Sequence, residues 1–226
     1  MKWPFGRVLK FVWKTTWMFL TFVFVLLIVF VGVRPPPGIY MMSEGIRLGG
    51  YEQTWVSIED ISPAMVRSVV AAEDANFCTH NGVDWEELFE VIEEGATRGA
   101  STISQQVAKN VFLWHQRSYV RKAIEIPLAL VIEVMWTKQR ILEVYLNVAE
   151  FDEGVFGVEA GAQTYFGVSA AELSDLQAAR LASILPDPKD RSASNPGPFT
   201  TRKAKTVMDG AATIDQDGRA DCFQDG

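Results

Sequence analysis

The chain has few cysteines, few histidines and no excess of positive charge, and each shortage excludes a class of protein. Two cysteines in 226 residues are too few for a fold built on disulfides. A net charge of -7 argues against general nucleic-acid binding. No metal-ligand spacing is present, so we expect no required cofactor, with a divalent cation left open as an aid. Cys78 lies in a conspicuous polar motif and Cys222 in a polar tail, and we expect both to be unpaired.

Only one long hydrophobic run is present, at residues 15–33, and it has the length of a transmembrane helix. The segment 1–14 before it carries four lysines and arginines, whereas only Arg34 closely follows it. This bias predicts a cytoplasmic N-terminus, a single-pass anchor in the inner membrane and a periplasmic remainder. A cleavable signal peptide is disfavoured because no small-x-small cleavage site follows the run.

The rest of the chain divides by composition into a linker, a helical domain and a tail. Residues 34–58 begin with three prolines and contain several glycines, which is typical of a loop or short hairpin. Residues 59–205 have helical periodicity nearly throughout, and 206–226 form a polar tail. We predict an all-α, lysozyme-like domain after one transmembrane helix. Caps and apolar spacing predict helices over 62–73, 84–95, 101–112, 118–135 and 137–147, and one that starts near Ser169 and stops at Pro186.

The first polar motif, residues 73–82, pairs two carboxylates at a predicted helix end. Glu73 and Asp74 are followed closely by Phe77 and His80. A carboxyl group at a helix C-terminus, beside another acid and an aromatic ring, holds its proton more tightly than a free glutamate. Such a group suits general acid or base catalysis. A solvated helix end is the simpler interpretation of the acid pair alone, but it does not require the aromatic and histidine that follow.

The second polar motif, residues 99–106, places hydroxyl and amide groups on the first turns of a predicted helix. A helix N-terminus favours anions, and these side chains could hold sugar hydroxyls or a phosphate. An ordinary polar helix start is the alternative, although Lys109 and Asn110 continue the polar surface. The candidate substrate-binding residues of this motif are Ser101, Thr102, Gln105 and Gln106.

A third group places two cations beside an acid, with Arg121, Lys122 and Glu125 on the first turns of another helix. Arg121 and Glu125 lie one turn apart, and a surface ion pair of this kind contributes little to stability. The functional interpretation is that the cations grip a diphosphate while Glu125 orients them.

These groups together resemble the peptidoglycan glycosyltransferases of family 51, in particular the membrane-anchored monofunctional type. Glu-Asp-x-x-Phe-x-x-His-x-Gly matches 73–82, Gly-x-Ser-Thr-Ile-x-Gln-Gln matches 99–106, and Arg-Lys-x-x-Glu matches 121–125. A fourth block, Lys-x-x-Ile-Leu-Glu-x-Tyr-Leu-Asn, matches 138–147. Four ordered blocks over roughly residues 55–205 are far more specific than one short motif.

The resemblance implies a membrane-bound enzyme that polymerises lipid II into β-1,4-linked glycan, with inversion and release of undecaprenyl diphosphate. It implies Glu73 as general base and Glu125 as the second catalytic carboxylate. Lipid II, the growing glycan and the membrane would be its partners, with other cell-wall synthesis proteins as further candidates and no nucleic acid. The implied substrate-binding residues are Asp74, Phe77, His80, Ser101, Thr102, Gln105, Gln106, Lys109, Asn110, Arg121 and Lys122.

Two other functions fit parts of the sequence. A lysozyme-like lytic enzyme has a similar size, helical class and catalytic glutamate, but it would leave the cations without a role. An inactive membrane-anchored scaffold of the wall-synthesis machinery would not need the acidic and basic blocks together. The Ser-x-x-Lys and Lys-Thr-Gly motifs of a penicillin-binding transpeptidase are missing from these residues.

Overall fold

The computed structural model describes residues 5–95, 99–116 and 118–224, and it divides into two compact units at Arg34 and Pro35. The first unit contains one helix, α1 (Phe5–Val29). Its stretch Arg7–Val29 is long and apolar enough to cross a membrane, with a mean hydropathy of 2.0. The helix starts before the predicted residue 15 and ends at Val29 rather than at Val33. A chain segment of this length and composition fits a single-pass anchor.

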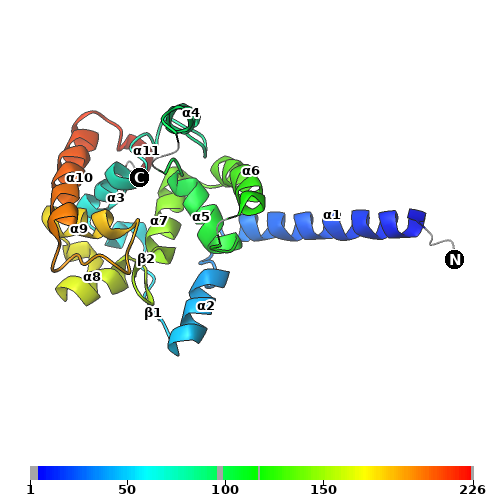
Figure 1. Cartoon of the computed structure of the whole chain (residues 1–226), viewed down its shortest axis with the longest axis horizontal. Coiled ribbons are helices and arrows are strands. Elements are labelled where there is room, and N and C mark those ends of the chain that lie inside the picture. Colours follow the sequence, from blue (N-terminus) through cyan, green and yellow to red (C-terminus); the bar gives the residue numbers. More distant parts are fainter. Residues whose placement is uncertain (1–4, 96–98, 117, 225–226) are drawn as a thin grey trace. The chain divides into compact units, whose positions relative to one another are not determined.

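The second unit is helical with a very small sheet, which confirms the predicted fold class (Figure 1). Strands β1 (Glu52–Gln53), β2 (Glu150–Asp152) and β3 (Val155–Phe156) form a sheet in the order β1-β3-β2. β1 is parallel to β3, and β2 is antiparallel to it. The helices of this unit are α2 (Ile39–Leu48), α3 (Pro63–Glu73), α4 (Trp85–Glu93), α5 (Ile103–Phe112), α6 (Tyr119–Met135), α7 (Lys138–Val148), α8 (Val158–Phe166), α9 (Asp175–Ile184), α10 (Pro198–Gln216) and α11 (Asp221–Gln224).

Two helix groups build the core of this unit. Helix α3 packs against α9 and α10, and α5 packs against α6 and α7. The interior is filled by apolar side chains that include Met65, Ile103 and Ile141. Helix starts follow the predicted caps, as in α5, where Thr102 and Gln105 form a reciprocal capping box. The first two polar motifs are thereby fixed to the ends of α3 and α5.

The predicted linker is partly wrong, because residues 34–58 contain the helix α2 and the strand β1. The glycines that indicated a loop have other roles. Gly49 has a φ of 78° and ends α2 in the left-handed conformation. Gly45 lies so close to the Tyr51 ring that an added Cβ would approach it to 2.7 Å. Glycine therefore marks packing and a helix end here rather than an irregular segment.

The predicted polar tail is also wrong, because α10 runs to Gln216 and α11 follows it. Val207, Ile214 and Phe223 are buried, each at most 3% exposed. Apolar residues recur one or two turns apart in α10, but many charged and small residues separate them and hide the pattern in the sequence. Another difference concerns Ser169, whose capping box closes a 3-10 turn, while α9 begins at Asp175 with its own capping box from Ser174.

The prediction that the two cysteines are unpaired is wrong as well. Cys78 and Cys222 form a disulfide across a sequence separation of 144, with their Cα atoms 5.7 Å apart. Helix α11 carries Cys222 back to the loop that follows α3, where Phe223 lies near the ring of Phe77. The sequence did not predict this pairing because the residues around Cys222 are mostly polar, which indicated an exposed tail. The disulfide holds the end of the described chain against the first polar motif.

Candidate active site

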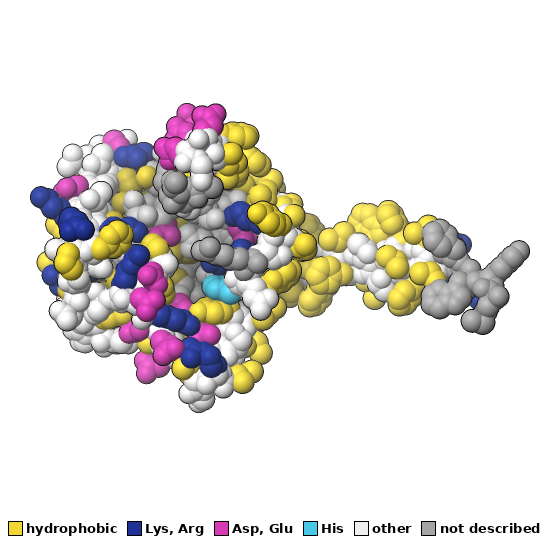
Figure 2. All heavy atoms as spheres, viewed as in Figure 1, with side chains coloured by type: hydrophobic (Ala, Val, Ile, Leu, Met, Phe, Trp, Pro, Cys, Tyr) yellow, Lys and Arg dark blue, Asp and Glu magenta, His cyan; other side chains and the backbone are white. Residues whose placement is uncertain are grey.

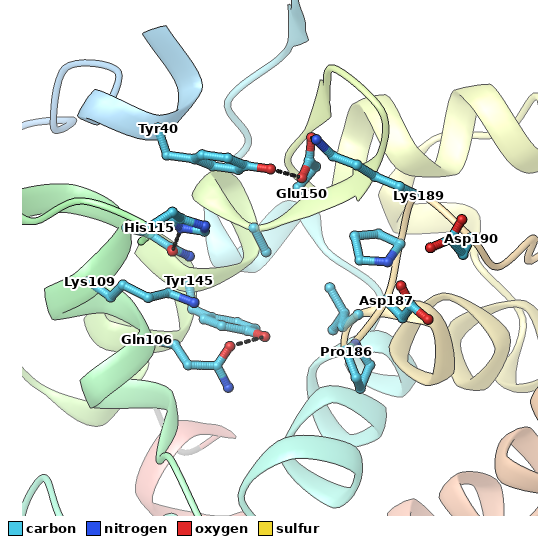
Figure 3. A pocket seen from close by; sticks show the side chains of 14 residues that line it. Tyr40, Gln106, Lys109, His115, Tyr145, Glu150, Pro186, Asp187, Lys189 and Asp190 are labelled. Carbon is cyan, nitrogen blue, oxygen red and sulfur yellow. Dashed lines mark hydrogen bonds and ion pairs between the residues drawn. The ribbon is translucent and has the colours of Figure 1, made fainter. Parts of the chain in front are cut away.

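The carboxyl group of Glu73 lies at the C-terminal end of α3, as predicted, and is held by a side chain from α5. Gln106 Nε2 donates a hydrogen bond to Glu73 Oε2 at 2.9 Å. Tyr145 of α7 donates in turn from its hydroxyl group to Gln106 Oε1 at 3.3 Å, as Figure 3 shows. Because Tyr145 is only 1% exposed and is held by the core, it fixes the orientation of the Gln106 amide. Three helices thus position one carboxylate.

Burial raises the pKa of Glu73. The hydrogen bond from Gln106 and the positive charges of Lys203 and Lys109 lower it, but they do not cancel the effect of desolvation. The raised pKa confirms the predicted direction, although burial is the main cause and the neighbouring Asp74 is a smaller one. Sequence reasoning missed Lys203, because it lies on α10 far from the motifs.

Asp74 and His80 bridge the first motif to the second from inside the protein. Asp74 Oδ1 lies 2.8 Å from His80 Nε2, and Asp74 Oδ2 accepts a hydrogen bond from the backbone N–H of Ile103 at 2.9 Å. The Asp74 carboxylate therefore ties the end of α3 to the start of α5. Both side chains are largely buried, which supports a role for this pair in holding the two motifs together.

Three further predicted binding residues also face the interior. Phe77, Thr102 and Gln105 are each at most 3% exposed. Phe77 packs beside Phe223, and Lys138 Nζ lies 4.2 Å from the centre of its ring. Thr102 donates from its hydroxyl group to the backbone carbonyl of Gly82 at 2.6 Å. Their positions support roles in shaping the site.

The predicted cationic group is built around a buried carboxylate. Glu125 is 2% exposed and is paired with both Arg121 and Lys122. Lys122 Nζ lies 2.6 Å from Glu125 Oε1 and also donates to Ser101 Oγ at 2.8 Å. The pair is thus not the weak surface ion pair of the alternative interpretation. Glu125 orients the two cations, and Lys122 links them to the second motif.

Two hollows are lined by residues of the first two motifs and of α5. One, of about 240 Å³, is lined by Glu73, Gly99 and Ser101 among others. The other, of about 320 Å³, is lined by Gln106, Lys109, Asn110 and Tyr145 on one side and by the segment 185–190 on the other (Figure 3). In Figure 2, basic and acidic side chains gather around the middle of this unit. Glu73 therefore lines one hollow, and Gln106, which donates a hydrogen bond to it, lines the other.

The larger hollow contains residues that sequence reasoning missed. The ring of Tyr40 stacks on His115 with centroids 3.7 Å apart, and its hydroxyl group donates to Glu150 Oε2 at 2.6 Å. Burial and the nearby positive charge of Lys109 lower the pKa of His115 to about 3, so its ring is neutral. Tyr40 lay in the presumed linker, and Lys189 lay beyond the proline that stops the last predicted helix. Neither residue belongs to a sequence motif that would have indicated a place in the site.

Comparison with known proteins agrees with this geometry. Residues 43–212 match the family model described as transglycosylase, which is most of the chain.

The chain belongs to the transglycosylase family.

Several curated relatives of this transglycosylase cover most of both chains, and each is named a biosynthetic peptidoglycan transglycosylase. The protein from Jannaschia sp. (strain CCS1) is 56% identical over 191 residues, which is 84% of this chain and 80% of the relative. The protein from Rhizobium meliloti (strain 1021) is 48% identical and covers 76% and 75%. The protein from Caulobacter vibrioides is 45% identical and covers 84% and 85%.

The site of this transglycosylase combines two chemical capacities. Glu73 can accept a proton, because it is partly buried and held in one orientation. Lys109 acts electrostatically on Glu73, and Lys122 reaches Ser101 on the lining of the same hollow, so positive charge is available there for an anion. Among the residues that the structure describes, no three histidine, cysteine or acidic side chains gather as metal ligands. The positive charge that the protein itself supplies here comes from lysine and arginine.

Proposed function

We propose that this transglycosylase polymerises lipid II into β-1,4-linked peptidoglycan glycan, with inversion and release of undecaprenyl diphosphate. The observation that carries the proposal is that Glu73 lines one hollow while Gln106, its hydrogen-bond donor, lines the other. Lys122, held by Glu125, donates to Ser101 on the lining of the hollow that contains Glu73. A reaction that joins two sugars needs two adjacent spaces and a base at their border. The names of the relatives, which are 56% and 48% identical, support the same substrate class.

In the proposed reaction, Glu73 removes the proton from the 4-hydroxyl group of the acceptor sugar. The resulting oxygen nucleophile attacks the anomeric carbon of the donor, and a new C–O bond forms. The bond from that carbon to the diphosphate oxygen breaks, and the electron pair leaves with the diphosphate. Attack opposite the leaving group inverts the configuration. The raised pKa of Glu73 makes its carboxylate a stronger base than an exposed glutamate.

The cationic side chains would bind the diphosphate as it leaves. Arg121 offers a planar fork for bidentate phosphate contact, and Lys122 and Lys109 offer point charges. Positive groups held in place stabilise the charge that develops on the leaving group. We propose that these side chains suffice and that a divalent cation is an aid at most. Retained polymerisation in the presence of a chelator would support this part of the proposal.

An anchor in a membrane would bring this chemistry to the place where a lipid-linked substrate resides. We propose that α1 crosses the inner membrane once, with the N-terminus in the cytoplasm and the catalytic unit in the periplasm. The basic residues before the apolar run and the length of the run support this orientation. Lipid II, the growing glycan and the membrane are then the partners, with other cell-wall synthesis proteins as further candidates.

The two rival functions leave parts of the site unexplained. A lytic enzyme cuts glycan with water and releases no diphosphate, so it has no use for Arg121 and Lys122 arranged around the buried Glu125. An inactive scaffold has no use for a half-buried glutamate held by Gln106. Maintaining buried charges is costly, which favours a catalytic purpose for both.

Replacement of Glu73 tests the proposal directly. Glu73→Gln keeps the shape of the side chain but removes the base, so lipid II polymerisation should fall at least about a hundredfold. Glu59→Gln changes an exposed glutamate and serves as the matched control. Activity is measured with labelled lipid II, and folding is checked by thermal unfolding. Polymerisation by folded Glu73→Gln at the rate of the control would overturn the assignment, and cleavage of sacculi without lipid II consumption would establish the lytic function.

A further inference from the structure

A separate hollow of about 420 Å³ lies beside the N-terminus of α4. Its lining comes from the loop that contains Thr79 and Asn81, from Trp85 at the start of α4, and from Leu130 on α6. Asn76 and Asp84 border both this hollow and the one lined by Glu73. The two spaces are therefore neighbours with a shared rim.

The lining has the chemistry of a sugar-binding surface. The indole of Trp85 is 48% exposed, which leaves an aromatic face open. The Asn81 side chain is exposed and makes no hydrogen bond with the described residues. Thr79 is exposed, and its hydroxyl group donates to the backbone carbonyl of Asn76, which leaves its oxygen free to accept. An aromatic face attracts the C–H groups of a sugar ring, while amides and hydroxyls bond its hydroxyl groups.

Charge disfavours other ligands. Asp84 and Glu86 line the hollow, and acidic side chains gather over α4, as Figure 2 shows at the top of the view. A phosphate or an anionic lipid headgroup would be repelled there. A bare acyl chain would leave the amides and carboxylates of the lining without partners. A neutral, polyhydroxylated ligand avoids both costs.

The rim is held in place before any ligand arrives. Asn76 Nδ2 donates to Asp84 Oδ2 at 3.0 Å, and Asp84 Oδ1 accepts from the backbone of Glu87 at the start of α4. Lys138 Nζ donates to the backbone carbonyl of His80 at 2.8 Å. The disulfide of Cys78 fixes the same loop. Little order would have to be imposed on binding, which favours affinity.

We propose that this hollow is a secondary glycan subsite, which holds a sugar of an N-acetylated β-1,4-linked chain away from the reacting carbon. The inference rests on the proposed function and extends it. Trp85 is the platform for the sugar ring, and Asn81 and Thr79 are its hydrogen-bonding partners. Because the subsite adjoins the hollow lined by Glu73, one glycan can occupy both, and contacts in one add to affinity in the other.

Binding of a neutral oligosaccharide tests the subsite. The probe is the β-1,4-linked tetrasaccharide of N-acetylglucosamine, titrated by calorimetry into the full chain in detergent. Trp85→Ala should weaken binding about two- to tenfold, the effect of losing one aromatic contact. Trp85→Tyr keeps an aromatic face and should restore most of the affinity. Asn81→Ala should weaken binding about two- to tenfold through a lost hydrogen bond, and it covers the case in which Trp85→Ala fails to fold.

Phe89→Ala is the matched control, because Phe89 is 59% exposed on the same helix but does not line the hollow. Its binding should equal that of the unmodified chain. Unchanged affinity in folded Trp85→Ala, or equal loss in Phe89→Ala, would overturn the subsite, as would the absence of any binding by the unmodified chain.

Lipid II polymerisation by the same preparations separates this inference from the function on which it rests. If the unmodified chain polymerises lipid II while Trp85→Ala binds the tetrasaccharide normally, the subsite fails and the function stands. If the unmodified chain consumes no lipid II, the proposed function fails instead. If the proposed function and the subsite are both correct, the Trp85→Ala variant should still form glycosidic bonds but release shorter glycan products.

Discussion

Glu73 has a proton affinity set by opposing influences that come from different helices. Burial raises its pKa, and Gln106, Lys203 and Lys109 lower it. The side chain must lose its proton to act as a base, so activity should fall as the pH drops through this raised pKa. The acidic limb of the pH–rate profile should therefore lie above 4.5, the ordinary pKa of a glutamate.

Removing the hydrogen bond from Gln106 should move that limb. This bond favours the charged carboxylate, so Gln106→Leu should raise the pKa of Glu73 further and shift the limb to higher pH. The shift is measured as kcat against pH for lipid II polymerisation. Gln163→Leu, at an exposed position, serves as the control. A limb at the same pH in Gln106→Leu would show that the hydrogen bond does not tune Glu73.

The chemistry of these residues could be predicted from sequence better than their roles. The motif around Glu73 predicted a carboxyl group with a raised pKa, which the structure confirms, while its role as the base stays a prediction. The resemblance implied that Asp74, Phe77 and His80 bind substrate, and this stays a prediction. All three are largely buried, but Asp74 lines the hollow that Glu73 also lines, and His80 lines the hollow beside α4. A motif groups residues that are needed together, and it does not separate those that touch a ligand from those that hold the backbone. Tyr145 is the opposite case, because the sequence indicated a core residue, whereas its hydroxyl group also orients the Gln106 amide.

At the scale of elements, the loop from Asp74 to Asp84 depends on one glycine. Gly82 has a φ of 92°, and an added Cβ would lie 2.9 Å from the backbone carbonyl oxygen of Ala129 on α6. Gly82→Ala should therefore reduce the free energy of unfolding by about 1–3 kcal/mol. Gly99→Ala is a suitable control because a Cβ added there would have no described atom within 4 Å. Urea unfolding measures both, and equal midpoints would contradict the role given to Gly82.

The disulfide is the second restraint on this loop. A closed loop of 144 residues should make the disulfide worth about 2–5 kcal/mol of stability. Cys78→Ser and Cys222→Ser should each lose this amount, and the double variant should lose no more than either, since all three lack the same bond. Denaturant unfolding with and without a reductant measures the effect. A reductant that destabilises the double variant as much as the unmodified chain would show that another cause is at work.

Helix starts were predictable because caps are local, as Thr102 and Asp84 show. Helices α2 and α10 were not, because long-range packing decides them. In α2, Tyr40 gains its partners from His115 and Glu150, more than seventy residues away in the chain. In α10, Val207 and Ile214 are buried by packing against α3 and α9. A local sequence pattern does not predict contacts with residues that are far away in the chain.

At the scale of the whole molecule, the division at Arg34 and Pro35 separates the apolar helix α1 from the unit that contains the candidate site. The unit 35–226 contains its own core and the whole candidate site, so it should fold without α1. A chain of residues 35–226 should unfold cooperatively, with a midpoint within a few degrees of that of the full chain in the same detergent. Thermal unfolding by circular dichroism measures this. A broad, non-cooperative transition would show that α1 is needed for folding.

The link between Cys78 and Cys222 also bears on the order in which the protein is made. Synthesis proceeds from the N-terminus, so Glu73 and its loop exist long before their covalent tie can form. Cys222 follows Cys78 by 144 positions in the sequence, and α10, which carries Lys203, lies between them. A chain interrupted before Cys222 would keep every motif of the first half and lack the bond that secures the loop after Glu73. The covalent restraint beside the candidate site therefore forms only after residue 222 has been made.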